Sequence, residues 1–402
     1  MAKREKRSSE IGIVDFFCGC GGMSYGFRQA SSPSLRYGIR GALDFDRHAV
    51  ATYRRMLGIN PMCRDIRELA APAVLREAAR SWGINKRDPW ILIGCAPCQG
   101  FSSHRKKDSR KDKRNSLLLT FANAISRLKP DLVVMENVPE IFQSKHWAHY
   151  KAWRDIVEAG GYTVRARIYN LAQFGVPQER YRALIIAARD WKHFSMPEPS
   201  KRSDEFVTVR QAIGTLPVLK SGECDSTDPM HITSRHRPST INLIRHIPAD
   251  GGSRKSLPKG IGLRCWKGVD GFRDVYGRLA WDKPAVAITA RCRTPSCGRF
   301  VHPEQHRGLS VREAAFLQGF PADYYFEGPF DDKYKQIGNA VSPQFAEQVA
   351  KHIAREWKLD HSRTKGDSPN LDVMAPIEKS ISSSLASMKR NIRTLEELHA
   401  TA

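Results

Sequence analysis

The chain has 402 residues, of which 65 are lysine or arginine and 42 are aspartate or glutamate, giving a formal net charge of +23. Its length allows one large domain plus a smaller one, because single hydrophobic cores stop growing at roughly 250 to 300 residues. A positive surplus of this size favours a polyanionic partner, although a well-solvated basic surface would give the same count.

Composition also argues against membrane and secreted proteins. The longest apolar runs, 90–96 and 183–188, are far shorter than the ~20 residues that a membrane helix needs. Residues 1–10 are charged and polar and have no apolar stretch behind them, so we expect no secretory signal. Nine cysteines without the dense framework of small secreted domains indicate reduced thiols. We therefore expect a cytoplasmic protein without a membrane anchor.

Apolar runs of strand length alternate with segments of helix length in the first half of the chain. The expected strands are 11–17, 37–43, 90–93, 132–135 and 183–187. Helices are expected from about Ser24 and at 48–57, 116–128 and 147–159. Such an alternation predicts an α/β fold with a parallel or mostly parallel sheet.

The sequence changes in character after Asp190. From about 195 to 297 it is rich in Pro, Gly, Ser, Arg and Lys and has little sustained periodicity, which predicts a separate irregular lobe. Helical patterning returns at 310–320 and 343–357. The residues after 360 are polar until an amphipathic pattern at 381–398 indicates another helix.

A glycine-rich segment, DFFCGCGG at 15–22, follows the first expected strand. Its glycines let the backbone approach a ligand closely, although a tight packing turn would also use them. Asp44 ends the next expected strand, where nucleotide-binding folds place an acid for ribose hydroxyls. The neighbouring Phe45 can pack on an adenine ring. Together the acid and the aromatic residue favour a nucleotide-like cofactor.

The segment GCAPCQGFS at 94–102 follows the strand 90–93 directly. Cys98 is therefore expected at the carboxyl edge of the sheet, where open α/β folds bind substrates. The neighbours Pro97, Gln99 and Gly100 indicate a loop rather than a core strand, which disfavours a buried inert cysteine.

Cys95 and Cys98 also form a C-x-x-C pair, which is typical of a redox couple or of half a zinc site. The other close pair, Cys292 and Cys297, has a gap at the edge of the usual ligand spacing. We therefore expect no metal.

Two further motifs carry charge. Glu136, in MENVP at 135–139, is expected at the same sheet edge as Cys98, although a carboxylate there is often a helix cap or an ion-pair member. The segment QERYR at 178–182 opens an apolar strand, and its alternation predicts that Gln178, Arg180 and Arg182 share one face. A basic patch over the pocket would follow, unless these charges are simply solvated.

In this order the motifs resemble those of the cytosine-5 DNA methyltransferases, over most of the span 11–353. The matching segments, in chain order, are 15–22, Asp44–Phe45, Asp65–Ile66, PCQ at 97–99, RNSL at 114–117, ENV at 136–138, QERYR at 178–182, Arg312–Glu313, LQGFP at 317–321 and GNAV at 338–341. Two departures are modest. Asp44 stands where the family often has Glu, and Cys95–Ala96 replaces a common Gly–Pro pair and gives a second thiol near the site.

The resemblance implies a Rossmann-like S-adenosylmethionine-dependent methyltransferase fold with a mostly parallel sheet and a small irregular target-recognition domain. The division expected is a basic leader (1–10), a catalytic and cofactor-binding domain (11–190), a target-recognition domain (191–303), a return to the catalytic domain (304–358) and a C-terminal tail (359–402). The implied activity is methyl transfer to carbon 5 of a cytosine that is flipped out of duplex DNA.

The resemblance also implies the roles of residues. Cys98 would attack carbon 6 of the cytosine, with Glu136 at ring nitrogen 3 and the exocyclic amine, Arg182 at the carbonyl oxygen and Arg180 in support. Cofactor binding is expected of Phe17, Gly19, Cys20, Gly21, Gly22, Asp44, Phe45, Asp65, Ile66, Pro97, Leu117, Asn339 and Val341. Substrate binding is expected of Gln99, Ser102, Asn137 and Gln178.

In the family the variable stretch, here about 190–303, carries target recognition. The cationic donors expected there are Arg235, His236, Arg237, Arg245, Arg254, Lys255, Arg264, Lys267, Arg273 and Arg278. The expected partner is duplex DNA with a GC-containing target, and a cognate restriction endonuclease would act separately. We expect a monomer that associates with the nucleoid through DNA.

Two alternatives stay open at this point. An RNA branch of the family methylates transfer RNA, but its typical Cys-Phe-Thr tripeptide does not occur in this chain. The other alternative is a catalytically silent nucleic-acid-binding protein. The intact Cys98, Glu136, Arg180 and Arg182 argue against it.

Overall fold

The computed structural model describes residues 9–85, 88–96, 116–258, 260–266, 274–359 and 372–378. The chain divides into two compact units. The first comprises Met1–Tyr169, Tyr181–Glu198 and Ala346–Ala402, and the second comprises Asn170–Arg180 and Pro199–Phe345. These limits differ from the expected boundaries near 190 and 303, because 170–180 and 304–345 cluster with the second unit. No helix in the described ranges has the length and apolarity needed to cross a membrane.

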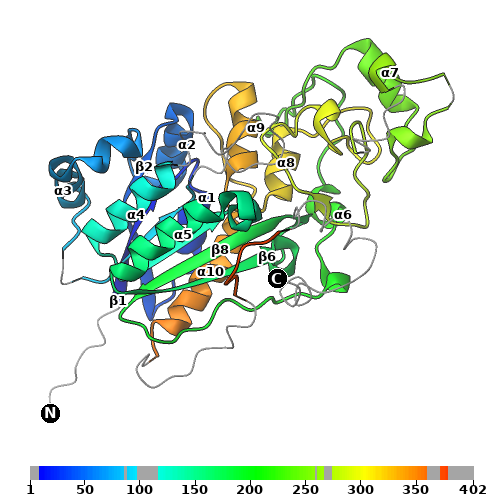
Figure 1. Ribbon diagram of the computed structural model, residues 1–402. Coiled ribbons are helices and arrows are strands. Elements are labelled where there is room, and N and C mark those ends of the chain that lie inside the picture. The colour runs from blue at the N-terminus through cyan, green and yellow to red at the C-terminus, as the bar shows by residue number, and fades with distance from the viewer. Residues whose placement is uncertain are drawn as a thin grey trace. The chain divides into compact units, whose positions relative to one another are not determined.

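The first unit is built on a seven-stranded sheet in the order β3-β2-β1-β4-β5-β8-β6 (Figure 1). The strands β3, β2, β1, β4 and β5 pair in parallel, whereas β8 runs antiparallel to β5. Their bounds are β1 Ser9–Phe16, β2 Leu35–Asp44, β3 Met62–Cys63, β4 Trp90–Gly94, β5 Leu132–Asn137, β6 Tyr162–Asn170 and β8 Tyr181–Arg189. The predicted α/β class with a mostly parallel sheet is confirmed, and each strand expected from an apolar run is present.

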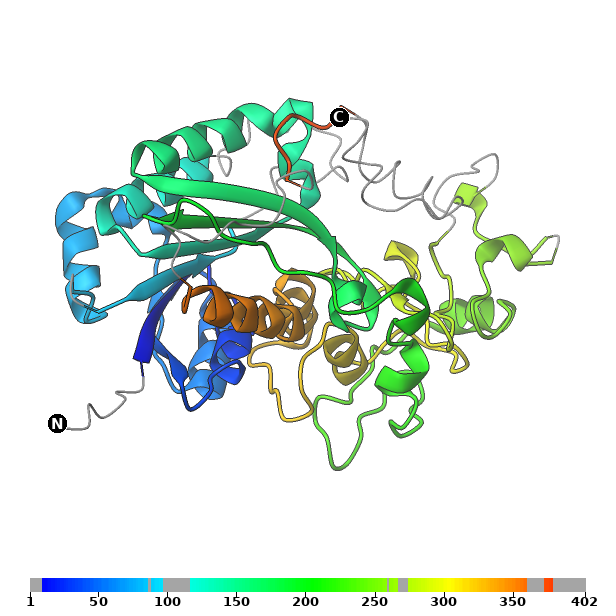
Figure 2. The same cartoon turned by 90° about the horizontal axis from the view of Figure 1, so that it is seen from below.

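Helices cover both faces of this sheet (Figures 1 and 2). On one face α3, α4 and α5 share a core with side chains of β1, β4 and β5. On the other face Tyr37 of β2 packs edge-on against Phe27 of α1, and its hydroxyl donates to the carbonyl of Ala350 in α10 at 2.7 Å. Bounds are α1 Gly22–Gln29, α2 Arg47–Leu57, η1 Ile66–Ala70, α3 Pro72–Ser81, α4 Ser116–Leu128, η5 Pro139–Phe142, α5 Ser144–Ala159 and α10 Pro343–Glu356.

This two-sided cover explains why the central strands are apolar throughout rather than alternating. Every residue of β4 and of β5 is buried, as strands in a sheet covered on both faces require. The helix expected at 48–57 begins one residue earlier, because the Asp46 side chain caps it by accepting from the backbone N–H groups of His48 and Ala49. It ends at Gly58, whose φ of 69° suits a helix C-cap.

The second unit has little regular structure, as its composition predicts. Its elements are η6 Leu171–Phe174, β7 Gln178–Glu179, η7 Ser203–Glu205, α6 Val209–Ile213, α7 Pro238–Arg245, η8 Arg254–Ser256, η9 Arg264–Trp266, β9 Ala285–Val286, η10 Pro295–Cys297, α8 Val311–Leu317 and α9 Phe330–Asn339. A fully buried ion pair stabilises it: the Arg307 guanidinium donates to both oxygens of Glu313 at 2.8 and 2.7 Å. Glu313 also completes a capping box with Ser310 at the start of α8.

Residues 372–378 form a short strap on the first unit. The carboxylate of Asp372 accepts from Nε of Arg165 at 2.6 Å and from Nε of Arg167 at 2.8 Å, and all three side chains are buried. Further on, Ile377 forms a bridge with Gln143, at the junction between η5 and α5. The strap lies beyond the family-like span 11–353, yet it supplies the charge that two buried arginines of β6 require.

Replacement of Asp372 tests that requirement. Removing one partner of a buried ion pair costs about 3 to 5 kcal/mol, because the remaining charge has lost its counter-charge. We expect Asp372→Asn to lower the free energy of unfolding by about that amount, measured from urea midpoints.

The matched control is Glu198→Gln. Glu198 also pairs with Arg167, at 3.3 Å, but its side chain is 68% exposed. Its replacement should change the free energy of unfolding by less than about 1 kcal/mol. Equal midpoints for Asp372→Asn and the parent protein would contradict the role assigned to the strap.

Candidate active site

The parallel register brings the ends of four strands to one edge of the sheet. Phe16 of β1 stands opposite both Leu43 of β2 and Gly94 of β4, and Gly94 stands opposite Met135 of β5. The residues that follow these positions therefore meet at the carboxyl edge, as the sequence predicts. From β1 the strand order runs to β2 and β3 on one side and to β4 and β5 on the other. The point at which the order of the strands reverses therefore lies between β1 and β4.

The glycine-rich segment forms a tight loop between β1 and α1. Phe17, Gly19 and Gly21 have φ values of 57°, 52° and 91°, a region that favours glycine. A Cβ on Gly19 would meet no atom within 4 Å, so the space beside this residue is open. The thiols of Cys18 and Cys20 are buried, and burial raises the pKa of Cys20 to about 12, so both pack as neutral groups.

Asp44 ties this loop to the end of β2. One carboxylate oxygen accepts from the backbone N–H of Gly19 and the other from that of Asp46, each at 2.8 Å. Burial raises the pKa of Asp44 above its usual value, although these hydrogen bonds oppose the shift. The adjacent Phe45 presents an aromatic ring that is 66% exposed. The predicted acid and aromatic residue thus stand beside the loop, with the ring open to a flat partner.

A buried chain of hydroxyl groups lies under the loop, and no motif in the sequence indicates it. Oγ of Ser24 donates to Oδ2 of Asp15 at 2.6 Å, and the hydroxyl of Tyr53 donates to Oγ of Ser24 at 2.7 Å. Burial raises the pKa of Asp15 to about 8. No spacing rule joins Asp15 in β1 to Tyr53 in α2, so only the fold reveals the contact.

Three other predicted cofactor residues lie in the first unit. Asp65 caps η1, and the Arg67 guanidinium pairs with both of its oxygens, at 3.0 and 2.6 Å, which lowers its pKa. The side chains of Ile66 and Leu117 belong to the hydrophobic core. Any contact that Ile66 makes to a cofactor would therefore come from its backbone.

The side chain of Glu136 is buried at this edge, with a relative exposure of 3%. Nε of Arg182 lies 2.8 Å from its Oε1, and Sγ of Cys95 donates to its Oε2 at 3.0 Å. The next residue, Asn137, donates from Nδ2 to the carbonyl of Ala96 at 3.2 Å. Asn137 thus holds Ala96, the residue directly before the predicted Pro97–Cys98–Gln99 segment. Pro97, Cys98, Gln99 and Ser102 lie outside the described residues, so of the C-x-x-C pair only Cys95 is described.

The strand predicted to start at Gln178 is not continuous. β7 ends at Glu179, and β8 begins at Tyr181 in the first unit. The continuous strand on which the shared face of Gln178, Arg180 and Arg182 depends is therefore wrong, because Arg180 lies between two strands that belong to different sheets. Within the second unit Arg180 is buried and donates to the carbonyls of Ile288 and Gly338, so it does not contribute to an exposed basic patch.

Gln178 is also buried in the second unit, where its side chain joins β7 to α8. Nε2 donates to the carbonyl of Leu317 and to Oε1 of Gln318, and Oε1 accepts from the N–H of Ile288. Asn339 is the exposed last residue of α9, whereas Val341 is buried. The roles predicted for these residues stay predictions.

The predicted cations of the irregular lobe differ in their surroundings. Arg278 is 1% exposed, and its guanidinium donates to the carbonyls of Ile244, Ile247 and Gln305, among others. Its predicted role as a DNA donor is therefore wrong, because its N–H groups hold the lobe together. The exposed cations of the set are Arg235, Arg237, Arg245 and Lys255; Lys267, Arg273 and the side chain of Arg264 lie outside the described part.

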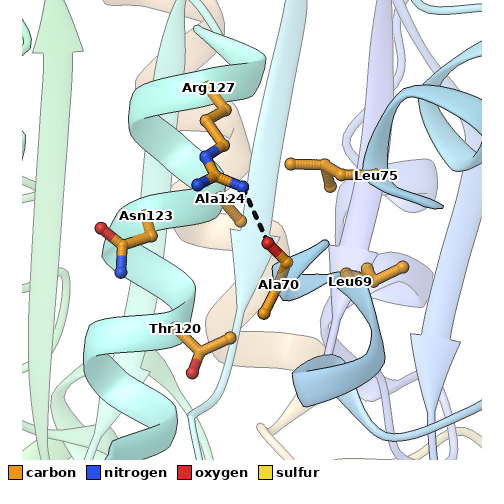
Figure 3. A pocket seen from close by; sticks show the side chains of 7 residues that line it. All are labelled: Leu69, Ala70, Leu75, Thr120, Asn123, Ala124 and Arg127. Atoms are coloured by element: carbon orange, nitrogen blue, oxygen red, sulfur yellow. Dashed lines mark hydrogen bonds between the residues drawn. The ribbon is translucent and has the colours of Figure 1, made fainter. Parts of the chain in front are cut away.

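One shallow pocket of about 170 Å³ lies in the helix layer of the first unit (Figure 3). Residues of η1, α3 and α4 line it: Leu69, Ala70, Leu75, Thr120, Asn123, Ala124 and Arg127. Arg127 donates to the carbonyl of Ala70 across it at 2.8 Å. None of the predicted site residues lines this pocket, so it is a gap between helices rather than the candidate site.

Comparison with known proteins decides the family. The model of the C-5 cytosine-specific DNA methylase family matches residues 11–355. The type II methylase M.HgiDII of Herpetosiphon aurantiacus is 34% identical over 360 residues, which cover 88% of this chain and 98% of that protein. The chain belongs to the C-5 cytosine-specific DNA methylase family. The resemblance carried by the motifs is confirmed, and the protein is a DNA cytosine-5 methyltransferase.

A second curated relative agrees with this assignment, and a solved structure shares the fold. The type II methyltransferase M1.HphI of Haemophilus parahaemolyticus is 32% identical over 345 residues, 85% of this chain and 86% of that protein. The crystal structure of a prophage-encoded Escherichia coli protein, assigned as a DNA modification methyltransferase, superposes with a TM-score of 0.61 at 24% identity. That alignment covers 87% of this chain and all of the other, and it shows the shared fold.

The family and fold imply that this methyltransferase uses S-adenosylmethionine. The described residues at the carboxyl edge fit an adenosyl group. The space beside Gly19 admits a ligand next to the backbone, Asp44 is a partly exposed acceptor for hydroxyl groups, and the ring of Phe45 is open for stacking.

The raised pKa of Asp15 predicts a pH-dependent stability. Because its pKa is about 8 in the folded protein and 3.8 ordinarily, its contribution is complete below about pH 3.8 and is lost as the pH rises toward 8. The Asp15→Asn variant stays neutral, so it should gain stability relative to the parent protein over this interval, by at most about 1.4 kcal/mol per pH unit. Urea unfolding at several pH values measures the difference, and parallel pH profiles would contradict it.

Substitutions of Arg278 and Arg245 test whether Arg278 stabilises the irregular lobe rather than binding DNA. Arg278→Gln leaves several buried carbonyls without a donor, so we expect a loss of at least about 2 kcal/mol in the free energy of unfolding. Arg245→Gln, at the exposed end of α7, should keep the stability. It should instead reduce the slope of log affinity for DNA against log salt by about one. An Arg278→Gln variant as stable as the parent, with weakened DNA binding, would reverse the assignment.

Proposed function

We propose that this methyltransferase modifies one cytosine within a specific duplex DNA sequence through a covalent adduct to Cys98. The observation that carries the proposal is the buried Glu136, paired with Arg182 at the sheet edge to which β4 leads. The Pro97–Cys98–Gln99 segment follows β4 after two residues. A nucleophile and an acid would thereby reach the same flipped base.

The chemistry of cytosine explains why both groups are needed. Carbon 5 is too weak a nucleophile to attack a methyl sulfonium until the ring becomes richer in electrons. The Cys98 thiolate would add to carbon 6, while Glu136 stabilises the proton on ring nitrogen 3 and accepts from the exocyclic amine. Carbon 5 then carries the electron density of an enamine. Loss of its proton and elimination of the thiolate after methylation restore the ring and the enzyme.

Other residues prepare this reaction. Arg182 orients the buried carboxylate of Glu136 and also donates to the carbonyl of Tyr181, and an N–H group of its guanidinium would donate to the cytosine carbonyl oxygen. Asn137 fixes the carbonyl of Ala96 and hence the start of the loop that carries Cys98. Arg180 and Gln178 support the second unit from within, through their bonds to backbone carbonyls.

The cofactor would bind at the loop 17–22 and at Asp44 and Phe45. S-adenosylmethionine, when bound, supplies an electrophilic methyl group. Asp44 would accept hydrogen bonds from the ribose hydroxyls and Phe45 would cover the adenine, while Gly19 leaves room for the ligand. We assign no metal to the reaction.

The irregular lobe would read the target sequence. Its exposed cations, Arg235, Arg237, Arg245 and Lys255, are suited to phosphates and base edges. The relatives M.HgiDII and M1.HphI are named as type II enzymes, which supports a restriction and modification setting with a separate endonuclease. The enzyme would act as a cytoplasmic monomer on nucleoid DNA.

Methyl transfer from labelled S-adenosylmethionine to duplex DNA of mixed sequence, followed by mapping of the modified cytosines, tests the proposal. We expect modification within one short sequence, no detectable turnover with Cys98→Ser, and a loss of about 10²- to 10⁴-fold with Glu136→Gln. Transfer to RNA instead of DNA would favour the transfer RNA branch. Binding without transfer would favour a silent DNA-binding protein.

A further inference from the structure

The Glu136 carboxylate has a second neighbour whose role the methylation chemistry does not explain. Sγ of Cys95 donates to Oε2, whereas Arg182 stands at the other oxygen, Oε1. The three residues come from three strands that are adjacent in the sheet, since Cys95 directly follows β4, Glu136 lies in β5 and Arg182 lies in β8.

The position of the thiol is fixed by the backbone on two sides. Gly94 is in register with Met135, so the next residues along each strand, Cys95 and Glu136, are brought side by side. The backbone N–H of Cys95 donates to the carbonyl of Phe16 at the end of β1, at 3.3 Å. The backbone register of the sheet therefore brings the thiol and the carboxylate together.

The two oxygens of Glu136 are held with unequal strength. A guanidinium beside Oε1 provides charge as well as donors, whereas a thiol is a weak, neutral donor. With 3% of its surface exposed, this carboxylate has little access to water, so the thiol supplies a hydrogen bond that solvent would otherwise provide. A weak bond orients Oε2 but yields readily to a stronger donor.

We propose that Cys95 is a positioning residue for methyl transfer. Its thiol holds the Glu136 carboxylate in the orientation in which Oε2 accepts from the flipped cytosine, and it gives up that oxygen when the base enters. This inference rests on the role of Glu136 under the proposed function. It also gives a purpose to Cys95, the residue by which this chain departs from the Gly–Pro pair common before the catalytic proline.

Two substitutions separate the hydrogen bond from the space that the side chain fills. Cys95→Ala removes the donor, so the carboxylate can turn away from its working orientation. We expect kcat on duplex DNA to fall about three- to tenfold, the effect of one neutral hydrogen bond, with KM for S-adenosylmethionine unchanged within about twofold. Cys95→Ser keeps a donor and should restore kcat to within about twofold of the parent enzyme.

A control and a double variant complete the test. Cys224→Ala removes an exposed thiol of the second unit, which donates to the carbonyl of Asp225, and it should leave kcat unchanged. Single-turnover rates of Glu136→Gln with and without Cys95→Ala show whether the thiol acts through the carboxylate. In that case the second substitution adds no further loss to the first.

The outcomes distinguish this inference from the proposed function. A Glu136→Gln enzyme as fast as the parent would remove the proposed role of Glu136, and the inference with it. A slow Glu136→Gln enzyme together with a fully active Cys95→Ala enzyme would overturn the inference alone. A Cys95→Ser enzyme as slow as Cys95→Ala would also overturn the inference. So would a Cys95→Ala substitution that lowers the single-turnover rate by the same factor in the parent enzyme and in Glu136→Gln.

Discussion

The ion pair between Glu136 and Arg182 depends on strand β8, which runs antiparallel to its neighbour β5. In a wholly parallel sheet every strand begins at the edge opposite to the site, so no residue at a strand start can reach a residue at a strand end. Because β8 is antiparallel to β5, its first residues lie beside the last residues of β5, and Asn137 stands opposite Ala183. The reversed strand thus delivers the Arg182 guanidinium to the carboxyl edge, beside the buried carboxylate of Glu136.

The direction and register of the strands also position the other predicted site residues at the carboxyl edge. The parallel strands β2, β1, β4 and β5 place Asp44, the glycine-rich loop, Cys95 and Glu136 in a row, and hydrogen bonds between neighbouring strand ends fix them. Asp44 binds the loop after β1, and Asn137 binds the residue before the catalytic segment. Each predicted functional group is therefore positioned by a partner on an adjacent strand, which limits its freedom before any ligand arrives.

Some of the arginines that make the chain basic are buried and stabilise the fold. Arg165 and Arg167 both pair with Asp372, Arg167 also pairs with Glu198, Arg307 pairs with Glu313, and Arg278 is surrounded by carbonyls. These arginines contribute to the net charge of +23, yet they are buried and stabilise the fold. Only the exposed fraction of the positive charge is available to DNA.

Sequence patterns predicted the parallel core, the glycine loop and the edge position of Glu136, because each depends on local periodicity or on strand ends. They missed β6, in which Arg165 and Arg167 break the apolar run and are compensated by a carboxylate some 200 residues away. The continuous strand at 178–182 and the DNA role of Arg278 were wrong for a related reason. Alternation and charge do not reveal that a guanidinium is fully occupied by distant backbone carbonyls.

In the proposed mechanism, a covalent bond to Cys98 activates the cytosine. Duplex DNA with 5-fluorocytosine at the target position tests it directly, because the fluorine cannot leave as a proton does and the adduct persists. With S-adenosylmethionine present, we expect a stable protein–DNA complex whose attachment site, located by tandem mass spectrometry, is Cys98. Attachment at Cys95, or methylated product without any covalent complex, would contradict it.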